Sequence, residues 1–505
     1  MRRILDLPLI VILMGIGALA MLVPAIHAGA LRDYTTARPF LYGSILFLFL
    51  TAMIGVATSN WRPSSVARSQ LASLIGAYLV LPLMLAVPFD EAVADTSFRN
   101  AWFEMVSAFT TTGATLYDTP DRLAPSIHLW RALVGWLGGF FVLLTAAAIL
   151  APLNLGGVEL TSGRAPGRGG AEGQQIARMA DPSARLVHHA LMLFPVYAGL
   201  TLSLWVMLLS AGDTSLIALC FAMATLSSSG ITPGMSFAAS PSGLPGEFLV
   251  FAFMLLAVTR RSMPGAVLVD RSRRLIDDHE VRLAALFLTV VPAILFLRHW
   301  VATIETDMAQ NLPAAFLAWW GALFTTLSFL TTTGLESAHW AAARAWSGLN
   351  APGLILLGLA MVGGGIATTT GGLKLLRVYA LARQAERELD RMVFPSSLGG
   401  GGMDARRLRN EGAYVAWIFF MLFALTMGVA IAVLSALGVG FEQALVLGIA
   451  AVTTTGPLAT LAAEVPIRYA ELSYPVKAVL GAAMILGRLE VLAILALLAP
   501  GAWRR

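Results

Sequence analysis

One pattern recurs along this chain, and its first copy reads Ser107-Ala108-Phe109-Thr110-Thr111-Thr112-Gly113-Ala114-Thr115. An apolar run leads into three hydroxyl residues and a glycine, and the same order returns at Thr225–Thr232, Phe329–Leu335 and Ala451–Pro457. The four glycines lie roughly 100 to 120 residues apart, enough chain for two membrane-spanning helices and a short third one. The spacing predicts four linked copies of one membrane unit.

The chemistry of this pattern suits an ion path. Backbone carbonyls that point inward can replace the water around an alkali cation, and glycine adopts conformations closed to other residues. One such segment cannot surround an ion, whereas four can. The alternative, close packing of helices through small residues, suits a single copy better than four copies at a regular spacing. The residues predicted to line the path are Thr111, Thr112, Gly113, Ser228, Ser229, Gly230, Thr332, Thr333, Gly334, Thr454, Thr455 and Gly456.

Composition indicates an integral membrane protein. Hydrophobic residues make up 57% of the 505 residues and charged residues only 12%, too few for the surface of a soluble multidomain protein. The single cysteine, Cys220, excludes an internal disulfide and a thiolate metal site. The net charge of +5 comes mainly from arginines between apolar spans. It therefore indicates how the chain is oriented in the lipid membrane, and not nucleic-acid binding.

The sequence contains no pattern typical of an enzyme. His188 and His189 are adjacent and cannot share a helical face, and neither a His-Glu-x-x-His nor a Gly-x-Ser-x-Gly motif occurs. Gly163–Gly170 resembles a phosphate-binding loop but lacks the Gly-Lys-Ser/Thr ending, so a flexible linker is the better interpretation. We expect no enzymatic activity and no cofactor in this chain.

The apolar spans predict an all-α integral membrane fold, with two N-terminal helices plus four pseudo-symmetric helix–pore loop–helix units around a central pore. The helix pair is predicted at 1–60, the pore units at 61–153, 186–275, 276–395 and 396–505, and a cytoplasmic linker at 154–185. Each unit contains a half-entering helix, and these are predicted at Phe98–Phe109, Thr214–Thr225, Pro313–Leu330 and Phe441–Val452.

The long spans also predict the topology. They are placed at Leu5–Ala28, Pro39–Thr58, Leu71–Val87, Ile127–Leu150, Leu186–Ser210, Glu247–Val269, Pro352–Leu376, Tyr414–Leu437 and Tyr474–Leu498, with one more from Val281. The arginine-rich loops then share one side, which the positive-inside rule assigns to the cytoplasm together with both termini. The half-entering helices come from outside, so the negative ends of their dipoles face the pore and favour a cation.

These motifs resemble those of the Trk/Ktr/HKT superfamily of potassium transporters, most closely the bacterial Trk-type potassium-translocating membrane subunit. The four runs resemble its selectivity-filter loops, and Leu129–Gly139, Gly363–Lys374 and Leu486–Glu490 also agree. The resemblance implies potassium uptake across the cell inner (cytoplasmic) membrane, with K⁺ held at the filter carbonyls. It further implies a homodimer and a cytoplasmic nucleotide-binding regulatory ring as partner.

The segment Gly363–Lys374 lies inside an expected span. Its five glycines each cost a helix about 1 kcal/mol relative to alanine, so the sequence predicts a broken helix. A close-packed glycine seam between helices is the alternative. The resemblance implies an intramembrane loop that obstructs the ion path below the filter and moves to open it. The gating residues would be Gly363, Gly364, Gly365, Gly371, Gly372 and Lys374.

Two charged residues lie at predicted membrane depth. Arg488 lies deep in the last span, where an unpaired charge costs roughly 2.5–3.5 kcal/mol, and Glu490 does not share its helical face. We expect Arg488 to project into the cavity below the filter and to slow cations. Glu104 is either a cation ligand or, as we favour, a carboxylate that holds the first loop through backbone amides.

Departures from the family pattern concern selectivity. The second run has Ser227–Ser229 followed by Ile231, and the fourth is followed by Leu458, where the family often has glycine. All four filter glycines remain, which in the family goes with potassium over sodium. The alternatives are a sodium-permeable or cation–proton-coupled carrier and, from another class, a membrane scaffold or sensor with vestigial filters.

Overall fold

A computed structural model describes most of the chain, and no strand occurs in the part that it describes. The described residues are 7–59, 66–150, 182–233, 237–259, 261, 275–303, 312–347, 353–394, 413–463 and 465–489. The predicted cytoplasmic linker falls almost entirely on 151–181, and Glu490 and the end of the last span fall on 490–505, so these predictions lie outside the described residues.

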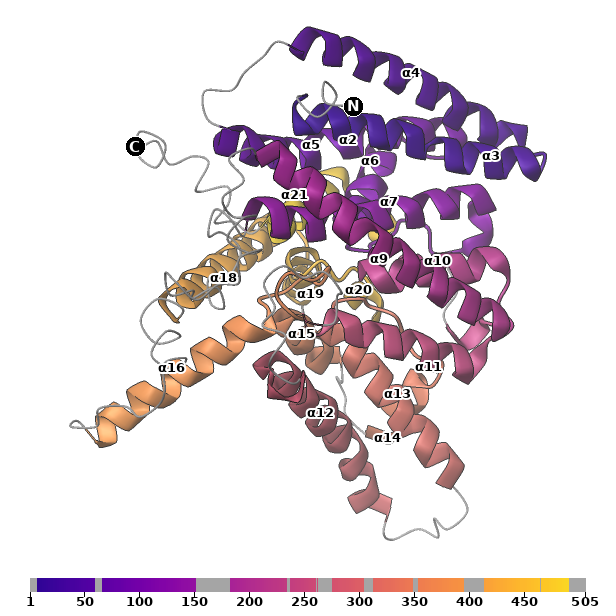
Figure 1. Cartoon of the computed structure of the whole chain (residues 1–505). Coiled ribbons are helices and arrows are strands. Elements are labelled where there is room, and N and C mark those ends of the chain that lie inside the picture. Colours follow the sequence, from indigo (N-terminus) through magenta and orange to yellow (C-terminus); the bar gives the residue numbers. More distant parts are fainter. Residues whose placement is uncertain are drawn as a thin grey trace.

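The N-terminal helices lie along one side of the molecule (Figure 1). Helices α2 (Leu9–Ala20) and α3 (Leu22–Ala30) form one apolar span, and α4 (Tyr34–Thr58) returns beside them. The second span starts earlier than predicted because Asp33 caps α4, accepting a hydrogen bond from the Thr36 N–H at 3.2 Å. Hydrogen bonds from Thr35 and Thr36 lower the pKa of Asp33, which keeps the cap ionised.

Four helical units follow. The first contains α5 (Val66–Ala92), α6 (Phe98–Phe109), α7 (Pro125–Thr145) and a π-turn at Ala146–Leu150. The second contains α9 (Pro182–Ser210), α10 (Ser215–Ser227) and α11 (Gly243–Met254), and the third α12 (His279–Thr303), α13 (Leu312–Leu330), α14 (Trp340–Ser347) and α15 (Gly353–Val362). After α16 (Leu375–Val393), the last contains α18 (Ala413–Ala436), α19 (Phe441–Val452), α20 (Leu458–Leu461) and α21 (Tyr474–Leu489). Short 3₁₀ turns lie at Pro120–Arg122, Phe237–Ala239, Leu255–Ala257, Leu275–Asp277 and Tyr469–Glu471.

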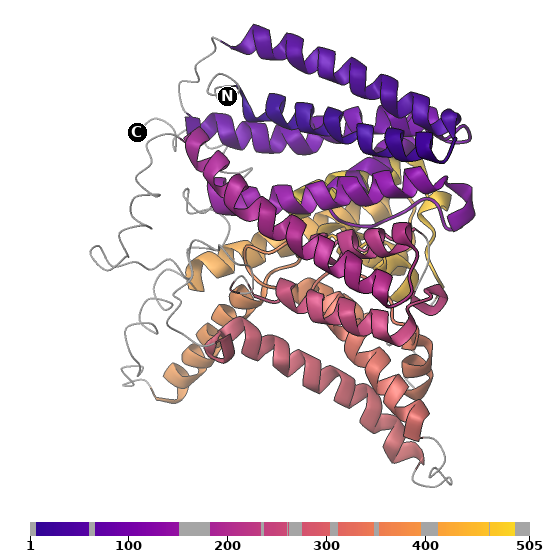
Figure 2. The same ribbon diagram turned by 45° about the vertical axis from the view of Figure 1, so that its right-hand side comes forward.

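The all-α membrane fold is confirmed. Among the described residues, eight helical segments are long and apolar enough to cross a membrane. The predicted span Glu247–Val269 is wrong in its start and continuity, because α11 begins at Gly243 and ends at Met254, followed by a 3₁₀ turn. Helices α12 and α13 lie on the side opposite to the N-terminal helices (Figure 2), and α16 projects away from the body (Figure 1).

Four helices lead directly into the repeated hydroxyl runs: α6, α10, α13 and α19, of which α10 includes the first hydroxyl residue of its run, Ser227. Helix α6 packs between α5 and α7, α10 between α7 and α9, and α19 between α18 and α21. The residues before each run are almost all buried, as at Met105–Phe109 and Gly448–Val452. Apolar packing therefore fixes where each helix ends, and with it the position of the loop that follows.

Candidate functional site

The four hydroxyl–glycine runs meet in the structure. We call them loop 1 (Thr110–Gly113), loop 2 (Ser227–Gly230), loop 3 (Thr331–Gly334) and loop 4 (Thr453–Gly456). At each glycine, a Cβ atom would collide with the next loop around the ring or with the residue directly after that loop. It would lie 2.2 Å from the Ser229 carbonyl oxygen at Gly113, 2.2 Å from the Thr333 carbonyl oxygen at Gly230, 2.8 Å from Pro457 Cγ at Gly334 and 2.3 Å from the Ala114 nitrogen at Gly456. The loops therefore form a closed ring in which each contacts the next.

Each loop begins with the same backbone turn. The middle hydroxyl residue adopts a left-handed conformation, with φ of 56° at Thr111, 51° at Ser228, 53° at Thr332 and 53° at Thr454. In loop 1, the Thr111 N–H bonds the Ala108 carbonyl and the Thr112 N–H bonds the Ser107 carbonyl, and loops 2 to 4 repeat both bonds. This is a Schellman cap. It commits these loop N–H groups to the preceding helix.

This turn was not predicted from the sequence, where the unusual backbone conformations were expected only at the glycines. Gly113, Gly230 and Gly334 are left-handed, with φ of 73°, 60° and 76°, but Gly456 is not among the positive-φ residues. The left-handed residue that ends each helix carries a side chain. A threonine there costs of order 1–3 kcal/mol, so the surrounding packing must impose the conformation.

The three hydroxyls of each loop have different hydrogen-bond partners. The first bonds a helix carbonyl four residues earlier, as Thr110 Oγ1 does with Val106 at 2.7 Å. The third pairs with the first, at 2.8 Å between Thr110 Oγ1 and Thr112 Oγ1, and loops 2 to 4 repeat both contacts. The middle hydroxyls take part in neither of these bonds. Those of Thr111 and Thr454 are buried without a hydrogen-bond partner among the described residues.

A cavity of about 370 Å³ opens beyond the glycines of all four loops. Its charged lining residues are Asp118, Glu336 and Arg468. Arg468 lies 3.9 Å from a carboxylate oxygen of Asp118 and 3.6 Å from one of Glu471. Burial raises the pKa of Glu336, although the positive charge of Arg344 partly opposes the shift.

Buried carboxylates hold the segments that follow loops 1 and 3. Glu104 pairs with Arg131 at 3.0 Å and accepts hydrogen bonds from Thr115 Oγ1 and the Leu116 N–H. These contacts match the loop-holding role that we favoured for Glu104. Sequence reasoning missed Glu247 of α11, which is fully buried. It accepts hydrogen bonds from Trp320 Nε1 at 2.8 Å, Ser337 Oγ at 2.9 Å and the Ala338 N–H at 2.6 Å.

Helix α7 passes directly behind the ring. At Gly138 a Cβ would lie 2.1 Å from the Phe109 carbonyl oxygen, and at Gly139 it would lie 2.7 Å from Ser227 Cβ. Only glycine permits so close an approach. These contacts explain the glycine pair within Leu129–Gly139.

The segment Gly363–Lys374, which we call the Gly-rich loop, breaks the helix as predicted: α15 ends at Val362 and α16 starts at Leu375. The Gly-rich loop lies against the middle hydroxyls of loops 2 and 3. Thr369 Oγ1 lies 2.6 Å from Ser228 Oγ, and the Gly371 N–H donates to Thr332 Oγ1 at 2.6 Å.

Loop 4 also contacts the Gly-rich loop. At Gly371, a Cβ would lie 2.1 Å from the Thr453 carbonyl oxygen. The Gly-rich loop therefore covers one end of the ring, and the cavity opens at the other. Glu280 of α12 also holds the Gly-rich loop, accepting a hydrogen bond from the Ile366 N–H at 2.8 Å, a contact that the sequence did not predict.

Two positively charged side chains hold the Gly-rich loop. Arg488 of α21 donates to the carbonyls of Thr369 and Thr370, the latter at 3.2 Å. Lys374 Nζ donates to the Thr370 carbonyl and, at 3.0 Å, to Thr370 Oγ1. Both side chains are buried. The structure thus brings Arg488 and the Gly-rich loop, distant in sequence, into direct contact.

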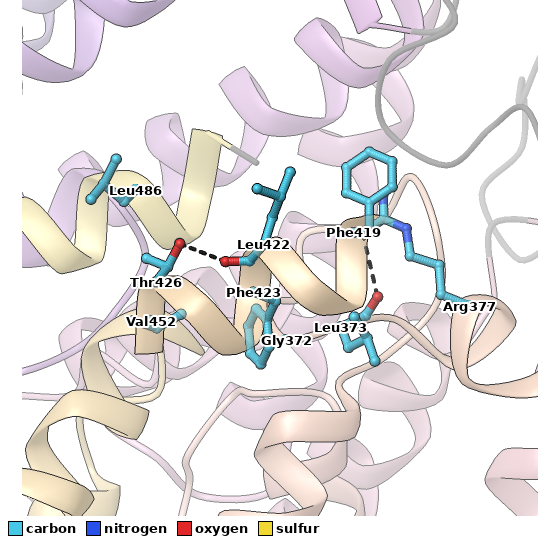
Figure 3. A pocket seen from close by; sticks show the side chains of 10 residues that line it. Gly372, Leu373, Arg377, Phe419, Leu422, Phe423, Thr426, Val452 and Leu486 are labelled. Atoms are coloured by element: carbon cyan, nitrogen blue, oxygen red, sulfur yellow. Dashed lines mark hydrogen bonds between the residues drawn. The ribbon is translucent and has the colours of Figure 1, made fainter. Parts of the chain in front are cut away.

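A small cavity of about 30 Å³ lies beside the Gly-rich loop, between α18 and α21 (Figure 3). It has room for about one water molecule. At its edge the Arg377 guanidinium lies 3.8 Å from the Phe419 ring centroid and donates to the Leu373 carbonyl at 3.4 Å. This arginine anchors the start of α16 to α18, next to the end of the Gly-rich loop.

Comparison with known proteins gives consistent matches. The family model TrkH, described as a cation transport protein, matches residues 246–502. The "Trk system potassium uptake protein TrkH" of Vibrio parahaemolyticus is 27% identical over 98% of both chains, and the protein of that name from Escherichia coli K12 is 27% identical over 96% of both.

A solved structure matches the whole chain. The crystal structure of the potassium transporter TrkH from Vibrio parahaemolyticus superposes with a TM-score of 0.79 at 25% sequence identity. The match covers 100% of this chain and 99% of the other. The helical arrangement is therefore shared over the full length.

Proposed function

The chain belongs to the TrkH family of cation transport proteins, and from this premise we propose that it takes up potassium ions across the cytoplasmic membrane through the ring of loops 1 to 4. The curated relatives are potassium uptake proteins by name, and the chain is a multi-pass membrane protein like them. The observation that carries the proposal is the closed ring of contacts between the four loops.

The backbone chemistry of the ring supports a cation as cargo. The Schellman turns commit the N–H groups of the middle and third hydroxyl residues of each loop to the preceding helix, while carbonyl oxygens at Gly113, Gly230 and Gly334 accept no hydrogen bond from the described residues. Helices α6, α10, α13 and α19 direct their C-terminal ends, and so their partial negative charge, at the ring. A dehydrated cation is stabilised there, whereas an anion is repelled.

The proposal includes a gate formed by the Gly-rich loop. It bonds two of the four middle hydroxyls, and Arg488 and Lys374 place positive charge beside it. A cation that leaves the ring on this side meets both the loop and these charges. We propose that transport requires the loop to leave Ser228 and Thr332, and that Arg488 stabilises the closed position.

Topology and partners belong to the same proposal. Both termini are assigned to the cytoplasm by the positive-inside rule, which places the cavity outside and the Gly-rich loop on the inner side. A homodimer and a cytoplasmic nucleotide-binding ring are proposed as partners. The projecting helix α16, with exposed Leu389, Met392 and Val393 near its end, offers a surface for such contacts.

Rubidium uptake into liposomes that contain the purified protein tests this function. We expect uptake that excess potassium suppresses and equal sodium does not, and a several-fold increase for Arg488→Ala. Arg122→Ala, at an exposed arginine that pairs with Asp95, is the control and should leave uptake unchanged. Equal inhibition by sodium would favour a sodium-permeable carrier, and no rubidium uptake at all would favour a scaffold or sensor.

A further inference from the structure

Loop 4 differs from the other three at its outer end. Directly after Gly456 the chain enters helix α20, whereas the described residues that follow loops 1 to 3 directly are not helical. The Gly456 N–H donates to the Thr112 carbonyl at 2.6 Å, a contact with loop 1 that has no equivalent at the other three glycines in the described chain. The fourfold pattern of the sequence is therefore broken at this residue.

The carbonyl of Gly456 is engaged twice. It accepts a hydrogen bond from the Ala459 N–H at 3.1 Å, in the first turn of α20, and one from the Tyr469 hydroxyl at 3.0 Å. The carbonyls of Gly113, Gly230 and Gly334 receive no donor from the described residues. A carbonyl oxygen with both lone pairs in protein hydrogen bonds is a poor ligand for an ion in the ring.

Tyr469 is built into this position. Its side chain is only 4% exposed, and its ring packs against Phe103 of α6 with centroids 5.8 Å apart. Burial raises the pKa of the phenol, so the hydroxyl keeps its proton, and its role as donor, across the physiological range. Tyr469 also lines the cavity that leads to the ring.

We propose that Tyr469 is a positioning residue that holds the Gly456 carbonyl away from the ion path, so that the outer end of the ring presents three glycine carbonyls. Pro457 closes the fourth side, because its ring lies 2.8 Å from a Cβ placed at Gly334 and 3.6 Å from one at Gly230. The inference rests on the proposed function, since it assigns the outermost cation position of the same ring.

This arrangement has a consequence for selectivity. Three carbonyls held at fixed positions, with water from the cavity at the outer end of the ring, suit a large cation better than a small one. Without the Tyr469 hydroxyl, Gly456 retains one hydrogen bond and its carbonyl can turn inward. Four more mobile carbonyls can then close around sodium as well as potassium.

Cation-dependent thermal unfolding of the full-length protein in detergent tests the inference, because a bound ion stabilises the folded state. We expect Tyr469→Phe, which keeps the ring and removes only the donor, to reduce the ratio of half-saturating sodium to potassium concentrations by about three- to tenfold. The matched control is Tyr117→Phe. Tyr117 lines the same cavity, but its hydroxyl donates to Thr96 and not to a loop carbonyl.

The outcomes separate the inference from the proposed function. A Tyr469→Phe ratio equal to that of Tyr117→Phe and of the unmodified protein overturns the inference and leaves the proposed function intact. If the unmodified protein gains no stability from potassium, the ring holds no potassium, and both are overturned. Competition by sodium against rubidium uptake should show the same three- to tenfold change, which a merely destabilised variant would not produce.

Discussion

The hydroxyl residues of the four loops shape the backbone of the ring. In loop 1, Thr110 and Thr112 bond the helix and each other, so their hydroxyls fix the backbone. Thr111 takes the left-handed conformation and turns the chain. The hydroxyl run is thus chiefly a device for shaping backbone. Serine can replace threonine for the same purpose in loop 2.

At the scale of single residues, the raised pKa of Glu336 predicts that cation uptake depends on external pH. Because burial raises its pKa, the carboxylate takes up a proton at a higher pH than an ordinary glutamate, and its attraction for cations is lost as the pH falls. We expect rubidium uptake at low rubidium concentrations to fall in mild acid. Glu336→Gln should raise the half-saturating concentration about two- to fivefold near neutral pH and flatten the pH profile.

The control for Glu336 is Glu471→Gln, at a 71% exposed side chain paired with Arg468. This variant should keep the pH dependence of the unmodified protein. If Glu336→Gln retained it as well, another group would be the titrating one, and the neighbouring Asp118 would be the next to test.

The buried pair Glu104–Arg131 predicts a large effect on stability. Glu104→Gln leaves Arg131 buried without its carboxylate, which typically costs about 3–5 kcal/mol. Asp95→Asn breaks the exposed pair with Arg122 and should cost about 0–1 kcal/mol. Thermal unfolding of the two variants in detergent compares them directly. Equal losses would mean that the Glu104 pair does not hold loop 1.

At the scale of elements, sequence patterns predicted helices better than loops. The bounds of α6 and α19 agree with the predicted Phe98–Phe109 and Phe441–Val452, because a polar or glycine residue precedes each helix and the hydroxyl run ends it. Helix α11 was predicted wrongly, since an apolar run does not reveal where a helix changes to a 3₁₀ turn. The contacts of Glu247 and Glu280 depend on tertiary packing and leave no local signal.

The Gly-rich loop yields a prediction about gating. At Gly371 an added Cβ would lie 2.1 Å from the Thr453 carbonyl oxygen, so Gly371→Ala must push the loop away from loop 4. We expect rubidium uptake to rise several-fold in this variant, because the proposed closed position becomes strained. Gly358→Ala on α15 is the matched control, since a Cβ there meets nothing within 4 Å.

Folded protein is required for this comparison, and gel filtration of both variants establishes it. If folded Gly371→Ala transported rubidium no faster than Gly358→Ala, the Gly-rich loop would not be the obstruction. A structural role in holding α15 and α16 together would then remain for it.

At the scale of the whole molecule, four repeated units converge on one ring. The repeat, the glycines and the broken helix could be read from the sequence, because each leaves a local pattern. The order of contacts around the ring, the contact of Arg488 with the Gly-rich loop and the asymmetry at Gly456 could not. They arise from the positions of residues far apart in the chain, as the contacts of Arg488 with Thr370 and of Gly456 with Thr112 illustrate.

The central claim is that loops 1 to 4 together hold a dehydrated monovalent cation. Anomalous diffraction from crystals grown in rubidium chloride tests it most directly. The account predicts a rubidium peak enclosed by the four loops, beside the carbonyls of Gly113, Gly230 and Gly334, that disappears when sodium replaces rubidium. Rubidium found only elsewhere in the protein, with none inside the ring, would contradict it.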